Sequence, residues 1–314
     1  MLWAVLTITA AAAQTARNAA QRGLVASVGT LGATHARFLY GLPFALLFLA
    51  GLGLAGVQLE WPQGAAVGWA ALGGVAQIGA TALLIAAMRS SAFMLAVAYT
   101  KLEPVLVMAI AALAVGEVPT TGQGVAIVAA TAGVLLMAWP AAATLSASRA
   151  AAVTPTGAGP AGETAIAEAW WRPLAYGLGS GALFALSAVA FRAAVLTFET
   201  PGFVAAAITT LALALAIQTV LFSAWLAATA PATLRALIAR PRAALPAGFM
   251  GALASAFWFM AFALASAPLV RTLALVEILM SGIVGRRLFA ETPSPRQIAG
   301  ATLLVAGIAG LFLG

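Results

Sequence analysis

The sequence predicts an all-α integral membrane protein in which ten transmembrane helices form two inverted five-helix repeats. Three observations support this fold class. Of the 314 residues, 63% are hydrophobic and only 7% are charged, whereas roughly a quarter of residues are charged in an ordinary soluble domain. The apolar residues also occur in runs of about twenty, the length that an α-helix needs to cross the hydrocarbon of a bilayer. Finally, polar residues of the first half recur in the second half at a constant spacing.

The apolar runs, and the Gly, Pro, Glu and Arg residues between them, predict where each helix lies. The expected helices span residues 1–23, 31–52, 66–88, 91–114, 121–140, 173–198, 202–228, 243–266, 268–289 and 295–314. Residues 141–172 are polar and rich in Ala, Thr, Ser, Gly and Pro, a composition typical of a flexible linker. The predicted domains are therefore a first repeat at 1–140, this linker, and a second repeat at 173–314.

The two halves match at a spacing of 174 residues, which separates Glu103 from Glu277. The other pairs at this spacing are Glu117 and Glu291, Pro119 and Pro293, Thr120 and Ser294, Gln123 and Gln297, and Gly133 and Gly307. Because only eight residues of the chain are acidic, two matched glutamate pairs are a strong signal of duplication. A repeat of five helices reverses direction in its second copy, and in many secondary transporters such inverted repeats enclose the solute site near the middle of the membrane.

A motif between the fourth and fifth predicted helices carries a resemblance to a known family. It consists of Gly116, Glu117, Thr120 and Gln123, and it is echoed at Ala290, Glu291, Ser294 and Gln297. With the Arg37-Phe38 pair, the chain resembles the EamA-like ten-helix members of the drug/metabolite transporter superfamily. The resemblance implies export of metabolites, amino acids or toxic compounds in exchange for a proton or another gradient. The chain departs from the family where the first helix has Gln14, Arg17 and Asn18 in place of a Trp-Gly pair, and where Val118 replaces a basic residue.

Composition argues against several other classes of function. The chain has no cysteine and one histidine, which leaves too few ligands for a zinc, haem or iron–sulfur site, so no metal and no cofactor is expected. The net charge of +7 comes from basic residues scattered singly, which disfavours nucleic-acid binding. The sequence has no aspartate and no His-Glu-x-x-His motif, so we do not expect an enzyme. The expected partners are a small-molecule solute and the lipid bilayer, with the chain a monomer or a homodimer.

The predicted location is the cytoplasmic (inner) membrane of a bacterium, because a chain rich in Ala, Gly and Arg suggests a GC-rich genome. Positive charge outside the helices falls on the loops that follow odd-numbered helices. These loops contain Arg22, Arg89, Arg149, Arg172, Arg235, Arg240, Arg242, Arg286, Arg287 and Arg296. The positive-inside rule then places both termini outside the cell, whereas related ten-helix transporters usually keep both termini inside.

Ionisable side chains at membrane depth are the first candidates for a functional site, because each costs at least about 2.5 to 3.5 kcal/mol to insert. Glu103 and Glu277 are predicted near the middle of the fourth and ninth helices, and Pro104 is expected to kink the fourth. In one interpretation these glutamates take up a proton or bind a substrate amine. In the other they form permanent ion pairs that lock helices together.

Cations and polar residues complete the candidate set. At a rise of 1.5 Å per residue, Arg17 and Arg37 should lie about 9 Å inside one membrane face, with Arg192 at a similar depth inside the other. Lys101 could extend to the membrane surface or meet an anionic substrate group. Gln14, Asn18 and Arg22 are spaced four residues apart and form a polar stripe that lines a cavity or packs between helices. The further candidates are Gln77, Tyr99, Gln218, Trp258 and Ser281, each a cavity-lining or a packing residue, and His35, expected to pack.

Taken together, the sequence predicts a secondary transporter that exports a small metabolite, amino-acid-like or drug-like solute by alternating access, with protons as a candidate coupling ion. Two alternatives remain open. The first is an exchanger or uptake carrier for an anionic, phosphorylated or nucleotide-linked metabolite, which the interior arginines would suit. The second is a membrane receptor that binds a solute without transporting it.

Overall fold

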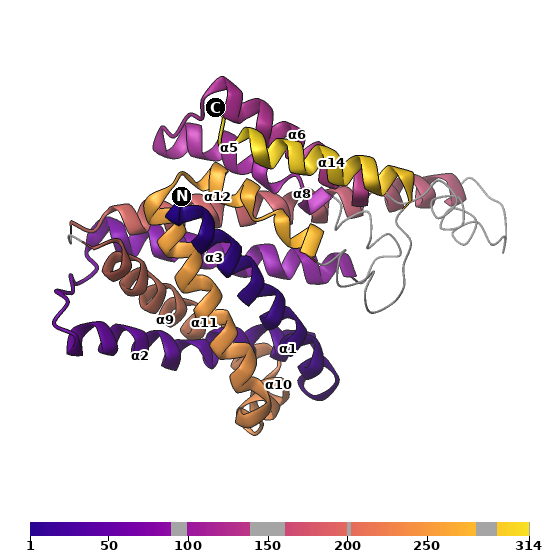
Figure 1. Ribbon diagram of the computed structural model, residues 1–314. Coiled ribbons are helices and arrows are strands. Elements are labelled where there is room, and N and C mark those ends of the chain that lie inside the picture. Colours follow the sequence, from indigo (N-terminus) through magenta and orange to yellow (C-terminus); the bar gives the residue numbers. More distant parts are fainter. Residues whose placement is uncertain (89–98, 139–160, 200–201, 281–293, 314) are drawn as a thin grey trace.

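The computed structural model describes residues 1–88, 99–138, 161–199, 202–280 and 294–313, and every regular element in these ranges is a helix. The helices are α1 (Leu2–Leu39), α2 (Gly41–Leu54), α3 (Gly64–Met88), α5 (Glu103–Val115), α6 (Thr121–Ala138), α8 (Ala161–Leu196), α9 (Phe203–Thr229), α10 (Pro231–Ile238), α11 (Pro241–Leu264), α12 (Ala267–Leu273) and α14 (Pro295–Gly310). Figure 1 shows their arrangement. The predicted all-α class is confirmed for the described part of the chain.

Within the described residues, six helical stretches are long and apolar enough to cross a membrane. They are Leu2–Leu54, Gly64–Leu84, Thr121–Ala138, Leu174–Leu196, Phe203–Thr229 and Pro241–Leu264. These helices fit the predicted multi-pass membrane protein. Parts of the fourth and ninth predicted spans lie outside the described residues, so the number ten stays a prediction.

A break separates the first two predicted helices, as expected. We predicted it between residues 23 and 31, and it lies at Gly29, whose φ of 73° and ψ of 173° are not helical, so α1 consists of two helical segments. Leu24 and Val28 extend the helix because they are buried against Leu237 and neighbouring residues. Glycine has no Cβ and adopts such a positive φ without strain. The predicted break is therefore present, and the first helical segment continues about five residues further than expected, as far as the glycine.

Two other boundaries also differ from the prediction. Helix α8 begins at Ala161, inside the segment 141–172 that was predicted to be a linker. Residues 139–160, which include the rest of that segment, lie outside the described residues. The short helix α10 was not predicted at all. Its Leu237 is fully buried, and the carbonyl of that residue accepts a hydrogen bond from the Tyr40 hydroxyl at 3.1 Å.

Helix breaks occur beside both of the repeated glutamates. The chain turns at residues 101–102, and α5 begins at Glu103. It turns again at residues 274–275, between α12 and Glu277. The prediction of continuous helices through these two positions was wrong. Pro104 does not kink the middle of a helix but occupies the first turn of α5, where its missing N–H would have had no helical partner.

Helices from before residue 140 pack against helices from after residue 160. The closest pairs are α1 with α11, α3 with α8, and α6 with α14, and the last pair lies side by side along the top of Figure 1. Glycine allows α6 and α14 to meet at backbone distance. A Cβ added to Gly133 would lie 2.5 Å from the nitrogen of Leu304, and one added to Gly307 would lie 2.5 Å from the nitrogen of Ala130. These contacts also show that the two helices run antiparallel.

The repeated Thr/Ser-x-x-Gln motif begins each of these two paired helices. Thr120 and Gln123 exchange backbone-to-side-chain hydrogen bonds of 3.2 Å in both directions at the start of α6. Ser294 and Gln297 do the same at the start of α14, with distances of 2.8 and 3.3 Å. This arrangement is a capping box, which satisfies backbone N–H groups that a helix start leaves free. The motif therefore has a structural role at both of its copies.

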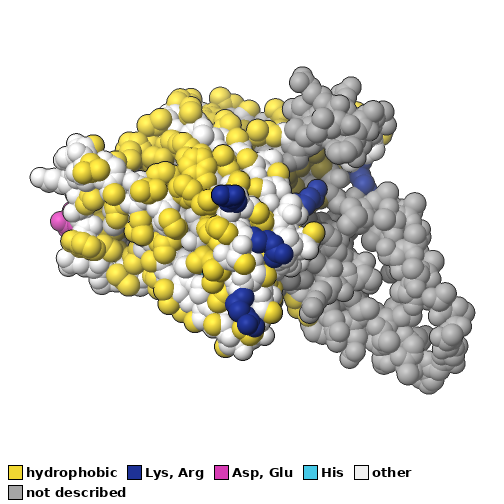
Figure 2. Space-filling model, turned by 90° about the horizontal axis from the view of Figure 1, so that it is seen from below, with side chains coloured by type: hydrophobic (Ala, Val, Ile, Leu, Met, Phe, Trp, Pro, Cys, Tyr) yellow, Lys and Arg dark blue, Asp and Glu magenta, His cyan; other side chains and the backbone are white. Residues whose placement is uncertain are grey.

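Small residues pack closely in the interior of the protein, and large apolar side chains are exposed on its surface. The main buried cluster draws on α1, α8, α9 and α11 and is dominated by alanine, which suits a bundle that must pack without a hydrophobic drive between helices. On the outside, Leu47, Leu113 and Val220 are 63, 89 and 66% exposed. Figure 2 shows the molecule from below. Apolar side chains cover much of the described surface in this view, and Lys and Arg side chains gather on one part of it. Such a surface suits contact with lipid.

Candidate functional site

A polar cavity of about 460 Å³ lies inside the bundle, between helices of both halves of the chain. It is bounded by α1, α3, α8, α9 and α11 and by the turns beside Glu103 and Glu277. The predicted candidates that line it are Gln14, Arg17, Asn18, Arg37, Gln77, Lys101, Glu103, Gln218, Trp258 and Glu277. Cavities of this size commonly hold small molecules. The structure thus brings together residues that lie on seven separate predicted helices.

Glu277 is held by residues of the first half of the chain. Its Oε2 accepts a hydrogen bond of 3.0 Å from Gln14 Nε2, and its Oε1 lies 3.7 Å from Lys101 Nζ. The side-chain oxygen of Gln14 in turn accepts a hydrogen bond of 3.3 Å from Trp258 Nε1 on α11. Lys101 therefore does not extend to the membrane surface. It faces the carboxylate of the opposite half.

Glu103 is held by a residue of the second half. Its Oε1 lies 2.5 Å from Arg271 Nη2, and the Arg271 guanidinium also stands over the Trp258 ring at 5.2 Å. Arg271 is not among the residues that the sequence analysis proposed for the site. The signal that could have found it is the general rule that an arginine within an apolar segment is a site candidate. Each glutamate thus meets a cation from the other half of the chain.

Arg37 and Arg17 occupy another part of the cavity and bind amides instead of carboxylates. Arg37 Nη2 donates a 2.5 Å hydrogen bond to Gln77 Oε1, which also accepts one of 2.8 Å from Gln218 Nε2. Arg17 Nη2 donates to the side-chain oxygen of Asn18 at 2.8 Å. Within the part of the chain that the structure describes, neither arginine has a carboxylate within ion-pair distance.

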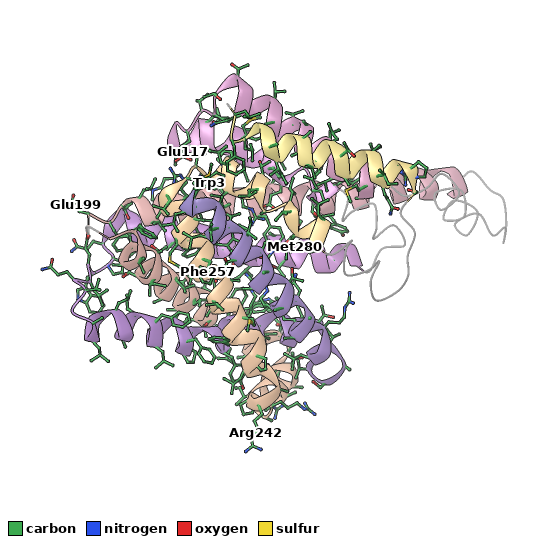
Figure 3. The ribbon with its side chains drawn as sticks, in the orientation of Figure 1. Trp3, Glu117, Glu199, Arg242, Phe257 and Met280 are labelled. Atoms are coloured by element: carbon green, nitrogen blue, oxygen red, sulfur yellow. The ribbon has the colours of Figure 1, made fainter. Side chains whose placement is uncertain are left out.

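Two predicted site residues are not among those that line the cavity. Arg192 forms an ion pair with Glu117, and it donates hydrogen bonds to the carbonyls of Phe262 and Ala265 at the end of α11. Figure 3 shows Glu117 in the upper left of the molecule, near Trp3 of α1. Tyr99, the second of these residues, precedes Thr100 and Lys101, which do line the cavity.

Two of the three residues of the polar stripe predicted for the first helix line the cavity. Gln14 and Asn18 line the cavity, while Arg22 is not among its lining residues. Gln21 lines it instead, and its amide donates a 2.8 Å hydrogen bond to the carbonyl of Ala33, on the far side of the break at Gly29. Ser281 lies outside the described residues.

His35 is a packing residue in this structure. Its side chain is fully buried, its Nε2 lies 2.8 Å from the Ser223 hydroxyl, and its ring meets Phe222 edge to face. It does not line the polar cavity. The described residues contain no group of three or more His, Asp or Glu side chains that could hold a metal ion.

The charges of the cavity lining are unequal. The lining holds four cations, Arg17, Arg37, Lys101 and Arg271, against two carboxylates. The ion pairs remain accessible from the cavity, since Lys101 is 28% and Glu277 24% exposed. In a low-dielectric surrounding such groups exert strong fields on anything that enters. The arrangement can therefore bind a charged or polar solute.

Comparison with known proteins supports the fold and goes no further. No family model matches the sequence, and no curated protein matches it. A solved structure described only as "Crystal structure of protein" aligns with a TM-score of 0.65 at 16% identity, covering 98% of this chain and 98% of the other. At this identity the likeness shows the fold alone. It extends over nearly the whole length of both chains.

Proposed function

We propose that the protein is a secondary transporter of the drug/metabolite transporter superfamily, and that it moves a small solute through the central cavity by alternating access. The observation that carries this proposal is the cavity itself. It is a polar space of about 460 Å³ among apolar helices, and ion pairs between the two halves cross it. Buried ionisable groups of this kind are costly in a membrane and usually mark a solute or ion path.

The contacts between α6 and α14 support the inverted-repeat part of the proposal. Gly133 meets Leu304, and Gly307 meets Ala130. Each member of the second contact lies 174 residues from a member of the first, so exchanging the two halves converts one contact into the other. The same exchange relates the helix pair α1 and α11 to the pair α3 and α8. A two-fold relation between the halves accounts for both observations.

The broken helices are a second line of support. In transporters with inverted repeats, discontinuous helices near the middle of the membrane commonly form the solute and coupling-ion site. Here the turns at 101–102 and 274–275 lie within one residue of matching positions in the two halves, and each ends within two residues of a glutamate that lines the cavity.

Glu103 and Glu277 are the coupling groups in this proposal. Each carboxylate is paired with a cation of the opposite half, so a rocking motion of one half against the other must separate the pairs. A carboxylate that has lost its cation in a site of low dielectric is stabilised by taking up a proton. Proton uptake would then be tied to the change of access.

The test is flux into proteoliposomes that contain the purified protein, with a panel of amino acids, carboxylates and cationic drugs and an imposed pH gradient. We expect Glu103→Gln and Glu277→Gln each to lower gradient-driven flux at least about tenfold, because glutamine cannot exchange a proton. Glu199→Gln is the matched control. Glu199 is exposed at the edge of the molecule in Figure 3 and does not line the cavity.

Two results would contradict the proposal. If both cavity variants transport with unchanged rate and pH dependence, the glutamates have no coupling role. If a solute raises the thermal unfolding temperature but never crosses the bilayer, the protein is a receptor and not a carrier.

A further inference from the structure

Arg17 and Arg37, the two arginines of α1 that line the cavity, differ from its other cations in their bonding partners. Lys101 and Arg271 each face a glutamate, but Arg17 and Arg37 are bound only to amide side chains among the residues that the structure describes. Guanidinium groups at membrane depth are expensive unless an anion or several acceptors surround them. Amides supply acceptors without neutralising the charge, so positive charge is left over in this part of the cavity.

Arg17 and Arg37 converge on the same point of α11. A Cβ built on Gly251 would lie 3.3 Å from Arg37 Cβ and 3.4 Å from Arg17 Cδ, so both side chains rest against this glycine. They come from opposite sides of the break at Gly29, and they approach each other because α1 bends there. Both arginines also line the same polar cavity, so their guanidinium groups can supply N–H donors to an acidic group that enters it.

An apolar pocket of about 380 Å³ lies directly beside this part of the cavity. Its walls come from α1, α3 and α9 and include Phe38, Phe222 and Trp225. Trp225 is 45% exposed, so the pocket is accessible from the lipid-facing side of the molecule. Its apolar lining offers nothing that would bind a charged solute.

The polar cavity and the apolar pocket share residues of their walls. Thr34 and Thr81 line both spaces. The Arg37 guanidinium lies 4.4 Å above the ring of Phe38, and that ring is part of the apolar wall. The part of the polar cavity that contains Arg37 therefore adjoins the apolar pocket. The side chains of Thr34 and Thr81 lie where the two spaces meet.

We propose that the transported solute is a small amphipathic carboxylate whose acidic group is held by Arg17 and Arg37 and whose apolar part occupies the pocket at Phe38 and Trp225. This inference rests on the proposed transport function and names its substrate class. The paired arginines supply the selection for an anion, and the adjoining pocket supplies the selection for an apolar chain. Neither space alone would favour such a solute over a simple anion or a neutral lipid.

The test is a binding series on the full chain in lipid nanodiscs, with straight-chain carboxylates from butanoate to decanoate as probes and the alcohols of equal length as references. Empty nanodiscs give the correction for partition into lipid. Affinity should rise about two- to fourfold with each added methylene, because a fully buried methylene contributes about fourfold. Each acid should bind at least about tenfold more tightly than its alcohol.

Variants separate the two parts of the site. Arg17→Gln and Arg37→Gln should each remove most of the preference for acid over alcohol, whereas Arg17→Lys and Arg37→Lys, which keep the charge, should retain part of it. Thr34→Phe and Thr81→Leu both narrow the junction and should flatten the dependence on chain length. Arg242→Gln is the control, since this arginine is exposed at the far tip of the molecule in Figure 3. Thermal unfolding of each variant checks that it is folded.

The inference is overturned if acids bind no more tightly than alcohols, if affinity does not depend on chain length beyond the empty-disc correction, or if the folded glutamine variants keep the full preference for acids. These outcomes are independent of the proposed function, because binding is measured without a gradient. Acids that bind as expected but never cross the bilayer would contradict transport and leave the substrate class intact. Flux of a neutral solute without binding of acids would contradict the substrate class alone.

Discussion

Two kinds of ion pair join the halves of this protein, and they differ in how completely their atoms are bonded. In the pair of Arg192 with Glu117, the arginine also donates to two carbonyls at the end of α11, and the second carboxylate oxygen accepts a 3.4 Å hydrogen bond from the N–H of Ala267. In the cavity, Arg271 binds Glu103, but its Nε has no hydrogen-bond partner among the described residues.

This difference separates the pair at Glu117 from the cavity pairs that we propose as functional. The pair at Glu117 uses its donors and acceptors to hold a loop against two helix ends, so any change of partner would leave several groups unsatisfied. The pairs at Glu103 and Glu277 face the cavity, and in the first of them Arg271 Nε has no hydrogen-bond partner among the described residues. The repeated glutamates Glu117, Glu103 and Glu277 therefore differ in their surroundings, although they belong to the same set of sequence matches.

The largest effect should come from breaking the well-bonded pair. We expect Arg192→Leu to lower the free energy of unfolding by about 3 kcal/mol, the lower end of the range for buried pairs that lose one partner. Arg271→Leu should cost less, about 1 kcal/mol, because Arg271 Nε has no hydrogen-bond partner among the described residues and fewer bonds are lost. Thermal or denaturant unfolding in lipid nanodiscs measures both values. Equal losses would show that the two pairs do not differ as proposed.

A contact between the halves that contains no charge gives the next effect. Gly133→Ala should destabilise the protein by about 2 to 3 kcal/mol, because the new Cβ would lie 2.5 Å from backbone atoms of α14 that cannot move aside cheaply. Gly124→Ala on the same helix is the matched control. Its Cβ would come no closer than 3.9 Å to Met108, so we expect no loss and a gain of up to about 1 kcal/mol from helix propensity. Destabilisation of the control by the same amount would exclude the close crossing as the cause.

An exchange of charges in the cavity should mainly affect transport. We expect Lys101→Glu and Glu277→Lys each to lower flux by about tenfold, since each variant places like charges opposite one another. The double variant restores the pair in reverse and should regain flux to within about threefold of the unmodified protein. Proteoliposome flux with matched protein amounts measures this. If the double variant is no better than the single ones, the pair does not act as a unit.

The smallest effect should come from the two capping boxes. Ser294→Ala and Thr120→Ala each remove one cap, and we expect a loss of about 1 kcal/mol in both cases with flux per folded molecule unchanged. Unfolding and flux measured on the same preparations separate the two effects. Loss of flux without loss of stability would mean that the repeated motif also serves the transport cycle.

Much of the candidate site could be predicted because buried charge is rare in an apolar chain. Glu103 and Glu277 were recognisable from their repetition, and both line the cavity. Arg192 was also proposed on grounds of depth, yet it binds Glu117 elsewhere, since depth along a helix does not tell which side of the helix a residue faces. Arg271 was missed for a related reason. Arg271 lies in α12, and its position along that helix does not tell that its side chain reaches Glu103.

The sequence by itself determined that the chain is helical, that most of its helices suit a bilayer, and that a few ionisable residues must be buried. These properties depend on the composition of short segments and on the cost of placing charge in hydrocarbon, so they can be inferred from the sequence alone. Only the tertiary structure decided which charges meet. Gln14 reaches Glu277 across 263 residues of sequence, and Lys101 and Arg271 each cross to the other half of the chain. Such pairings depend on how helices pack and where they break, and packing is decided by the shapes of many distant residues together.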